Sequence, residues 1–149
     1  GEERHSRRFA QVVVDARKTM KIKTTGQLID VLKEALPEPL RRRVERGERT
    51  GKRHFATRIF QALRIAVNDE LGSLRRGLSE LWKPLASGGR MAVISFHSLE
   101  DRIIKNYFRD HYKEGTGELL MKKPLEASGE ERTINPRSRS AKLRAIKKK

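Results

Sequence analysis

The apolar residues near the start of the chain recur at helical spacing. Between residues 5 and 19 they fall at positions i, i+3, i+4 and i+7, which predicts a helix with one buried stripe. A second helix is predicted to begin at Thr24 or the residue after it, because Thr24 and Gln27 match a capping box. Pro37 and Pro39 are expected to end this helix, since proline cannot continue it.

The middle of the chain combines a basic segment with further helical patterning. Residues 40–53 are rich in Arg and contain two glycines, so we interpret them as a mobile loop with at most a short helix. From Ala56 to Trp82 the apolar residues again recur at helical spacing. A break is expected near Gly72, which gives either two helices or one bent helix.

A buried strand and a capped helix are predicted to follow. Residues 91–94 form a short apolar run, typical of a strand buried on both faces in a parallel sheet. Ser98 and Asp101 match a capping pair for a helix directly behind this strand. With the preceding helix and the Gly88-Gly89 turn, these elements predict one αβα step of an open α/β sheet.

The rest of the chain is expected to add two strands, over residues 117–122 and 141–148, joined by a long polar loop over residues 124–140. A mean sheet has about five or six strands, so these strands alone make an incomplete one. Either another chain or a preceding part of the same protein is therefore expected to complete the sheet.

Charge carries the first indication of function. The chain has 149 residues, enough for one domain or somewhat more, and its 35 Lys and Arg against 19 Asp and Glu give a net charge of +16. Such a domain usually binds nucleic acid, because Lys and Arg neutralise phosphates and release counterions. A solvated basic surface, or an adaptor that docks on acidic protein, are the alternatives. Without an apolar run of spanning length, a signal-peptide core or Cys, a reducing, cytoplasmic setting is expected.

The turn between the predicted strand and helix is the first candidate site. In open α/β sheets ligands bind outside the carboxyl ends of strands, and a helix N-terminus offers free N–H groups to anions. His97 and Ser98 would then line a pocket. The alternative is that Ser98 and Asp101 only cap the helix, with His97 an ordinary polar loop residue.

Three other kinds of site find no support in the sequence. The turn supplies the residue types of a Ser–His–Asp hydrolase, but sequence neighbours rarely meet in triad geometry, and no G-x-S-x-G elbow exists. The four His are scattered without metal-ligand spacing, so no metal is expected. The glycines form no nucleotide-binding loop of the G-x-G-x-x-G or G-x-x-x-x-G-K kind.

Two further segments place Arg at spacings that favour contacts. Residues 135–144 are basic and contain no acid, and Arg137 and Arg139 are expected to alternate on a strand edge, where guanidinium forks suit phosphates. The helix from Ala56 also carries a polar ridge, which a solvated face or ordered hydrogen bonding would explain. This ridge consists of Arg58, Gln61, Arg64 and Asn68.

Four blocks of the sequence stand out together. They are the opening Gly-Glu-Glu-Arg-His-Ser-Arg-Arg, the helix over 56–70, residues 88–104 with Ser-Phe-His-Ser-Leu-Glu-Asp-Arg, and residues 135–144 with Asn-Pro-Arg-Ser-Arg-Ser-Ala-Lys-Leu-Arg. In this order and with similar gaps, the blocks resemble the ribosomal RNA small subunit methyltransferase H family. The resemblance covers essentially the whole chain.

The resemblance implies an enzyme that uses S-adenosylmethionine to methylate the exocyclic amine of one cytidine in 16S ribosomal RNA. Its α/β fold would be a Rossmann-like methyltransferase sheet interrupted by an inserted helical domain for substrate recognition. Residues 1–53 would be the latter part of the insertion. Residues 54–149 would be the C-terminal part of the Rossmann-like domain, with a late parallel strand and a terminal antiparallel pair. The partner would be 16S ribosomal RNA or the small ribosomal subunit, with a homodimer as a further option and no membrane.

The family's Gly-rich cofactor loop, acidic ribose ligand and Asp-Leu-Gly motif all precede the matched segment. The chain therefore resembles the C-terminal half of the enzyme, and we assign no cofactor-binding residue to it. Most of the S-adenosylmethionine site is expected in the preceding part, so the chain alone is expected to be inactive. Phe55 stands where the family more usually has Pro.

By its place in the matched blocks, His97 is expected to orient the target base or accept a hydrogen bond near it. The residues expected to bind the RNA substrate are Arg53, His54, Arg58, Ser95, Phe96, Ser98, Asn135, Arg137 and Arg139. The alternative function is a basic RNA-binding module without enzymatic activity, which would bind RNA and transfer no methyl group.

Overall fold

The computed structural model describes residues 2–3, 5–48 and 54–149, which form two compact units that divide between Asn68 and Asp69. Asp69 adopts a left-handed backbone with φ 46°, and this conformation ends one helix and begins the next. The break predicted near Gly72 is therefore misplaced by three residues. Gly72 lies inside the second helix, where a Cβ atom would collide with the Asp69 carboxylate.

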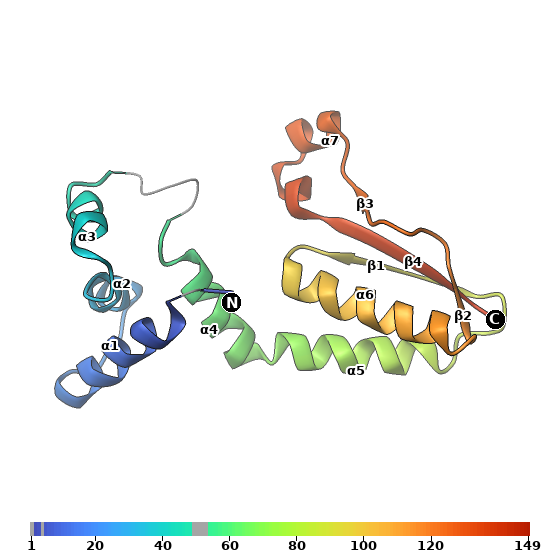
Figure 1. The fold of residues 1–149 in the computed structure, drawn as a ribbon, viewed down its shortest axis with the longest axis horizontal. Helices are drawn as coiled ribbons and strands as arrows, with labels where there is room; N and C mark the ends of the chain where they lie inside the picture. Colours follow the sequence, from blue (N-terminus) through green and yellow to red (C-terminus); the bar gives the residue numbers. More distant parts are fainter. Residues whose placement is uncertain (1, 4, 49–53) are drawn as a thin grey trace. The chain divides into compact units, whose positions relative to one another are not determined.

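The first unit is helical (Figure 1). Its elements are α1 (Ser6–Thr19), α2 (Thr25–Lys33), α3 (Glu38–Glu45) and α4 (Thr57–Asn68). The predicted capping box of α2 is confirmed: Thr24 Oγ1 accepts from Gln27 N at 3.2 Å, and Gln27 Oε1 accepts from Thr24 N at 3.2 Å. Pro37 does not end this helix, which has already stopped at Lys33, but immediately precedes α3.

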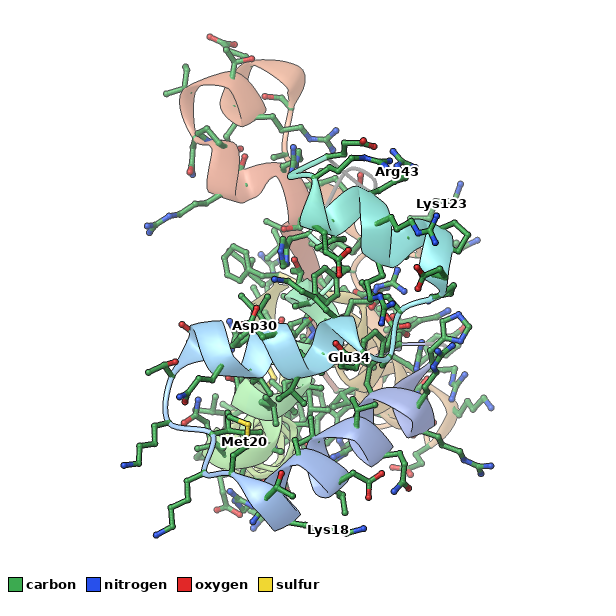
Figure 2. The ribbon with its side chains drawn as sticks, turned by 90° about the vertical axis from the view of Figure 1, so that its left-hand side faces the viewer. Lys18, Met20, Asp30, Glu34, Arg43 and Lys123 are labelled. Atoms are coloured by element: carbon green, nitrogen blue, oxygen red, sulfur yellow. The ribbon has the colours of Figure 1, made fainter. Side chains whose placement is uncertain are left out.

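The core of the first unit lies between α1, α2 and α4. Phe9, on the predicted stripe of α1, packs with Leu32 of α2, and Ile59 and Phe60 of α4 cover this cluster. Charged side chains such as Lys18 and Asp30 lie outside it (Figure 2). The same three helices leave an apolar groove of about 560 Å³.

The second unit is a sheet with helices. Its helices are α5 (Glu70–Trp82), α6 (Ser98–Lys113), α7 (Gly129–Ile134) and the short 3-10 helix η1 (Pro136–Ser140). Its strands are β1 (Arg90–Ser95), β2 (Gly117–Leu119), β3 (Leu125–Glu126) and β4 (Lys142–Lys148). β4 lies between β1 and β2, and β3 also pairs with it (Figure 1). Because β4 is antiparallel to both β1 and β2, those two strands run in the same direction.

The burial of β1 differs from the prediction. Met91 and Ser95 are buried, whereas Ile94, which alternates with them, is 57% exposed. The strand predicted to be buried on both faces is therefore buried on one face within this chain. In the part of the chain that the structure describes, β4 is also the single neighbour of β1, so the other edge of β1 is unpaired.

The core of the second unit joins α5, α6 and the sheet. Trp82 of α5, Phe108 of α6, and Met91 and Ile146 of the strands form one buried cluster. Gly117 lets β2 approach this cluster, because a Cβ atom there would lie 2.6 Å from Ile146 Cδ1.

The long polar loop predicted over residues 124–140 is wrong. That segment forms β3, α7 and η1, and β2 ends at Leu119 rather than at residue 122. A local cap explains α7: Ser128 Oγ accepts a hydrogen bond from Glu131 N at 3.1 Å.

Candidate functional site

The turn after β1 is fixed by a capping box that differs from the predicted one. His97, not Ser98, is the N-cap of α6, and its Nδ1 accepts from Glu100 N at 3.2 Å. In return, Glu100 Oε2 accepts from the backbone N–H groups of Phe96 at 2.8 Å and His97 at 3.2 Å. The predicted Ser98–Asp101 capping pair is therefore wrong by one residue, and Ser98 is the exposed first residue of the helix.

The capping bond also defines the tautomer of His97. Since Nδ1 accepts a hydrogen bond, the neutral imidazole carries its proton on Nε2. Nε2 is buried and has no hydrogen-bond partner among the described residues, although Glu100 Oε1 lies 3.4 Å away outside hydrogen-bond geometry. Buried donors are nearly always satisfied in native structures, so this buried Nε2 donor is unusual, and Glu100 Oε1 is an acceptor close to it.

Ser95 and Phe96 differ in what they offer to a substrate. Ser95 is 2% exposed, and its Oγ donates to Lys142 O at 3.4 Å, so it ties β1 to β4. Phe96 is 53% exposed and stands directly before the cap. An exposed aromatic ring is a platform on which a nucleobase can stack.

Asp101 is the carboxylate of a buried ion pair that sequence reasoning missed. Arg144 of β4 donates to it through Nε at 2.7 Å and Nη2 at 3.2 Å, and Lys142 Nζ lies 3.9 Å away. The hydrogen bonds from Arg144 are the main cause that lowers the pKa of Asp101 below its ordinary value. One signal could have indicated the pair, namely a charged residue between Leu143 and Ala145 in a strand that is otherwise apolar there.

Residues 135–140 form a 3-10 turn instead of the predicted strand edge. Ser138 is buried, and its Oγ donates to Asn135 O at 2.8 Å, which curls the backbone. Arg137 and Arg139 therefore do not alternate along an edge, but both stay exposed in η1, as does Asn135. Neither Arg forms an ion pair with a carboxylate in the described ranges, so both guanidinium groups are available to an anion.

The structure brings two of the predicted segments together. Ser95, the last residue of β1, is in register with Lys142, the first residue of β4. Because β4 is antiparallel to β1, the 95–98 turn and η1 meet at the same end of the sheet. An exposed aromatic ring, a buried donor and unpaired guanidinium groups therefore share one end of this unit. These are the features with which proteins hold single-stranded RNA.

The remaining predicted site residues belong to the first unit or lie outside the described residues. His54 is exposed, and its Nδ1 accepts from Ala56 N at 3.3 Å before α4. Arg58 is exposed on α4 and donates to Glu2 O at 3.2 Å. Arg53 lies outside the described residues.

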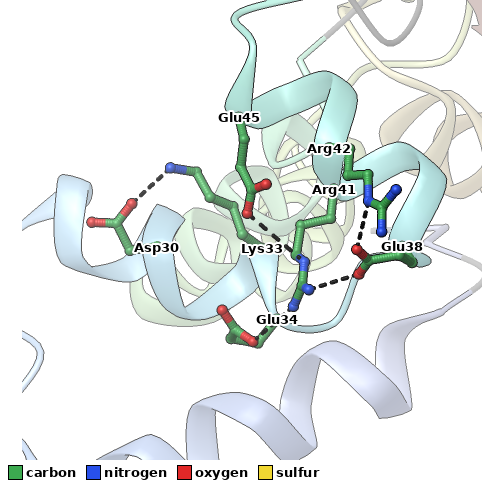
Figure 3. Close-up of polar contacts among 7 residues, drawn as sticks. All are labelled: Asp30, Lys33, Glu34, Glu38, Arg41, Arg42 and Glu45. Carbon is green, nitrogen blue, oxygen red and sulfur yellow. Dashed lines mark hydrogen bonds and ion pairs between the residues drawn. The ribbon is translucent and has the colours of Figure 1, made fainter.

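Much of the basic charge at α3 is paired. Arg41 lies 3.3 Å from Glu34 and 2.6 Å from Glu38, and Arg42 lies 2.8 Å from the same Glu38 (Figure 3). The hydrogen bond from Arg42 is the main cause that lowers the pKa of Glu38. The described part of the predicted basic loop is thus a short helix with ion pairs rather than an open positive surface.

Neither the turn after β1 nor the small pocket beside α6 and β4 forms an S-adenosylmethionine site by itself. The turn after β1 holds a capping box instead of a Gly-rich loop, and a pocket of the second unit, about 150 Å³, is smaller than the roughly 300–1,000 Å³ of ligand sites. Within the described ranges, no group of three or more His, Asp or Glu gathers as a metal site. Nor does any helix there have the length and apolarity to cross a bilayer.

The antiparallel sheet and its covering helices are consistent with part of an α/β methyltransferase. The model of the MraW methylase family matches residues 1–149, and the chain belongs to this family. It is similar to proteins named ribosomal RNA small subunit methyltransferase H. The identity is 48% for that of Symbiobacterium thermophilum and 51% for that of Leptospira interrogans serovar Lai, each over 99% of this chain. The match covers 49% and 42% of those two proteins, so the chain spans about half the length of the curated relatives it matches.

Proposed function

We propose that the chain is the C-terminal half of an S-adenosylmethionine-dependent enzyme that methylates the exocyclic amine of a cytidine in 16S ribosomal RNA. The name of the relatives and the half-length coverage support this proposal. In it, residues 1–53 belong to a helical insertion for substrate recognition and residues 54–149 to the Rossmann-like domain. α4, which the structure groups with the first unit, then begins the return to that domain. The reaction would take place in the cytoplasm, on the small ribosomal subunit.

The observation that carries the proposal is the meeting of the 95–98 turn and η1 at one sheet end. A late strand parallel to β2, with β4 antiparallel between them, supports the expected end of a Rossmann-like methyltransferase sheet. In open sheets this carboxyl end is where ligands bind. The edge of β1 opposite β4 would pair with the preceding half of the sheet.

The chemistry makes a positioning role for these residues reasonable. The lone pair of an aromatic exocyclic amine is delocalised, so methyl transfer needs tight alignment and the loss of an amine proton. The cytidine must leave its stack to reach a pocket. Phe96 would stack on the extruded base, and His97, whose Nδ1 is engaged, would donate its Nε2 proton to it.

The other predicted residues would contact the RNA substrate. Ser95 and Ser98 would shape the substrate side of the turn. Cationic and polar residues would contact the RNA backbone, namely Arg53, His54, Arg58, Asn135, Arg137 and Arg139. S-adenosylmethionine supplies the methyl group when bound, and we propose that its site lies mostly outside this chain.

Methylation of small ribosomal subunits by the full-length protein tests the proposal. His97→Asn and His97→Ala form a matched pair, because Asn is a good N-cap and Ala is a poor one, worth about 1 kcal/mol of stability. We expect both variants to lose methyl transfer, with a fall in kcat, while His97→Asn keeps the stability of wild type. A wild-type rate for His97→Asn would contradict the role of His97. A wild-type protein that binds the RNA without methylating it would favour the non-enzymatic RNA-binding module.

A further inference from the structure

A second basic feature of the sheet unit lies outside the 95–98 turn and η1. Where the chain leaves β2, a small pocket opens between α6, β4 and the residues after Leu119. Four cationic side chains line it, and they come from three separate parts of the chain. They are Lys105 and Arg109 of α6, Lys122 after β2, and Arg144 of β4.

The size of the pocket limits what it can hold. Its volume of about 150 Å³ is space for roughly five waters at about 30 Å³ each. This is less than the roughly 300–1,000 Å³ of sites that enclose a whole small molecule. Phe108 and Leu119 form an apolar part of the lining, so the polar contacts come from the cationic rim. A single group of phosphate size fits these limits.

The positive charges at the rim are only partly compensated by carboxylates. Lys105 and Lys122 are exposed and form no ion pair within 4 Å of a described carboxylate. After the hydrogen bonds from Arg144, the charge of Lys105 is nevertheless among the causes that lower the pKa of Asp101. The carboxylate near Arg109 belongs to Asp110, at 3.7 Å. Arg144 is neutralised by Asp101 through Nε and Nη2, which leaves Nη1 without a hydrogen bond to the described residues.

Part of this arrangement is repulsive when no anion is present. Lys105 and Arg109 are spaced i, i+4 on α6, and like charges at that spacing destabilise a helix. Lys122 brings further positive charge to the same hollow, and Arg144, whose charge Asp101 compensates, offers its free Nη1 as a donor. A phosphate would relieve this repulsion and accept hydrogen bonds from several side chains at once.

We propose that this pocket binds one phosphate group of the RNA backbone. The choice of RNA as the source of the phosphate rests on the proposed function, whereas the pocket and its charges do not. The site adds a contact outside the 95–98 turn and η1, on the helix that the turn begins. It would therefore fix the register of the RNA relative to α6 without reading a base.

Salt dependence of RNA binding by the full-length protein tests the proposal. The probe is a single-stranded RNA of about 20 nucleotides, measured by fluorescence anisotropy between about 50 and 200 mM salt. The pocket variant is Lys105→Gln with Lys122→Gln. The control is Lys113→Gln with Lys123→Gln, which removes the same charge from α6 and from the segment after β2, at residues that do not line the pocket.

Loss of one phosphate contact should make the negative slope of log K against log salt shallower by about 0.7 for a single strand. We expect this loss in the pocket variant and a smaller one in the control. Equal slopes in the two variants would overturn the proposal. Titration with inorganic phosphate separates the two sources of the ligand. Phosphate binding that Lys105→Gln and Lys122→Gln abolish, with no change in the RNA slope, would assign the pocket to free phosphate and overturn the RNA assignment.

A separate assay, methylation of small ribosomal subunits by the wild-type protein, tests the proposed function independently of the phosphate site. If the wild type transfers no methyl group but RNA binding by the pocket variant depends less steeply on salt, the proposed function fails and the phosphate site stands. If methylation is intact and the two variants share one slope, the phosphate site fails alone.

Discussion

The pair between Asp101 and Arg144 joins α6 to β4, and its contribution to stability can be measured. Asp101→Asn keeps the shape of the side chain but leaves Arg144 charged with 12% of its side chain exposed. Removing one partner of a buried pair typically costs about 3–5 kcal/mol. Because both side chains keep some contact with water, we expect a loss of about 2 kcal/mol in the free energy of unfolding, below that range. Adding Arg144→Met should restore part of the loss, since no unpaired charge then remains.

The loss should depend on pH in one direction. Hydrogen bonds from Arg144 lower the pKa of Asp101 in the folded state below the ordinary 3.8, so folding favours the ionised carboxyl. The stabilisation is therefore complete above about pH 4 and disappears as the pH falls through the lower folded-state value. The difference between wild type and Asp101→Asn should stay constant at neutral pH and shrink only in acid.

Urea unfolding followed by the fluorescence of Trp82 measures this loss in the second unit. Trp82 is the single tryptophan of the chain and is 7% exposed in the core of that unit. With an m value of about 1–3 kcal/mol per molar, a loss of about 2 kcal/mol moves the midpoint by roughly 0.7–2 M. Asp110→Asn is the control on the same helix, where an exposed contact of 3.7 Å should contribute less than about 0.5 kcal/mol. Equal midpoint shifts in Asp101→Asn and Asp110→Asn would refute the reasoning.

Three further predictions follow from the same structure. In the same unfolding assay, Gly117→Ala should destabilise the protein by about 1–3 kcal/mol, because its Cβ atom would clash with Ile146 of β4. Gly77→Ala, in open space within α5, should stabilise it by about 0.5–1 kcal/mol. A Gly117→Ala variant more stable than Gly77→Ala would contradict the packing of β2. Arg137→Gln with Arg139→Gln should reduce the salt dependence of RNA binding by the full-length protein, and an unchanged slope with an unchanged urea midpoint would show that η1 does not contact RNA. Glu38→Gln should lower the helicity of the first unit at low salt, as measured by far-UV circular dichroism, and a difference that persists at about 1 M salt would argue against ion pairs as its cause.

Local signals predicted the local elements well. The stripe with Phe9 and the capping box at Thr24 are both present, because each depends on residues within one or two turns. Residues 40–53 are predicted as a mobile loop with at most a short helix because they are rich in Arg and contain two glycines. The start of α3 is missed because Pro37 and Pro39 are taken to end the preceding helix, whereas proline is equally suited to the start of a helix. The apolar run of β1 showed a strand, but a run of four residues does not show which face another layer covers.

The sequence predicts where the candidate site lies better than it predicts the side-chain contacts within it. The position of the turn follows from topology, because ligands bind at the carboxyl ends of strands in such sheets. The residues that shape the turn escaped notice for two reasons. His97 with Glu100 departs from the usual Ser or Thr capping box, and Asp101 and Arg144 are 43 residues apart in the sequence. Sequence spacing carries no information about a pair that only the register of β4 brings together.

The order of the strands has a consequence for synthesis on the ribosome. β1 and β2 are separated by β4, whose first residue follows its partner Ser95 by 47 positions. At about 5–20 residues per second, a nascent chain carries β1 without this partner for roughly 2–9 s. During that time α6 is already made and can cover one face of β1, but the edge of the strand that β4 later covers stays open to other chains. Slower translation after Ser95 would lengthen this exposure, and a chaperone that holds extended apolar segments would protect the chain until Lys142–Lys148 emerges.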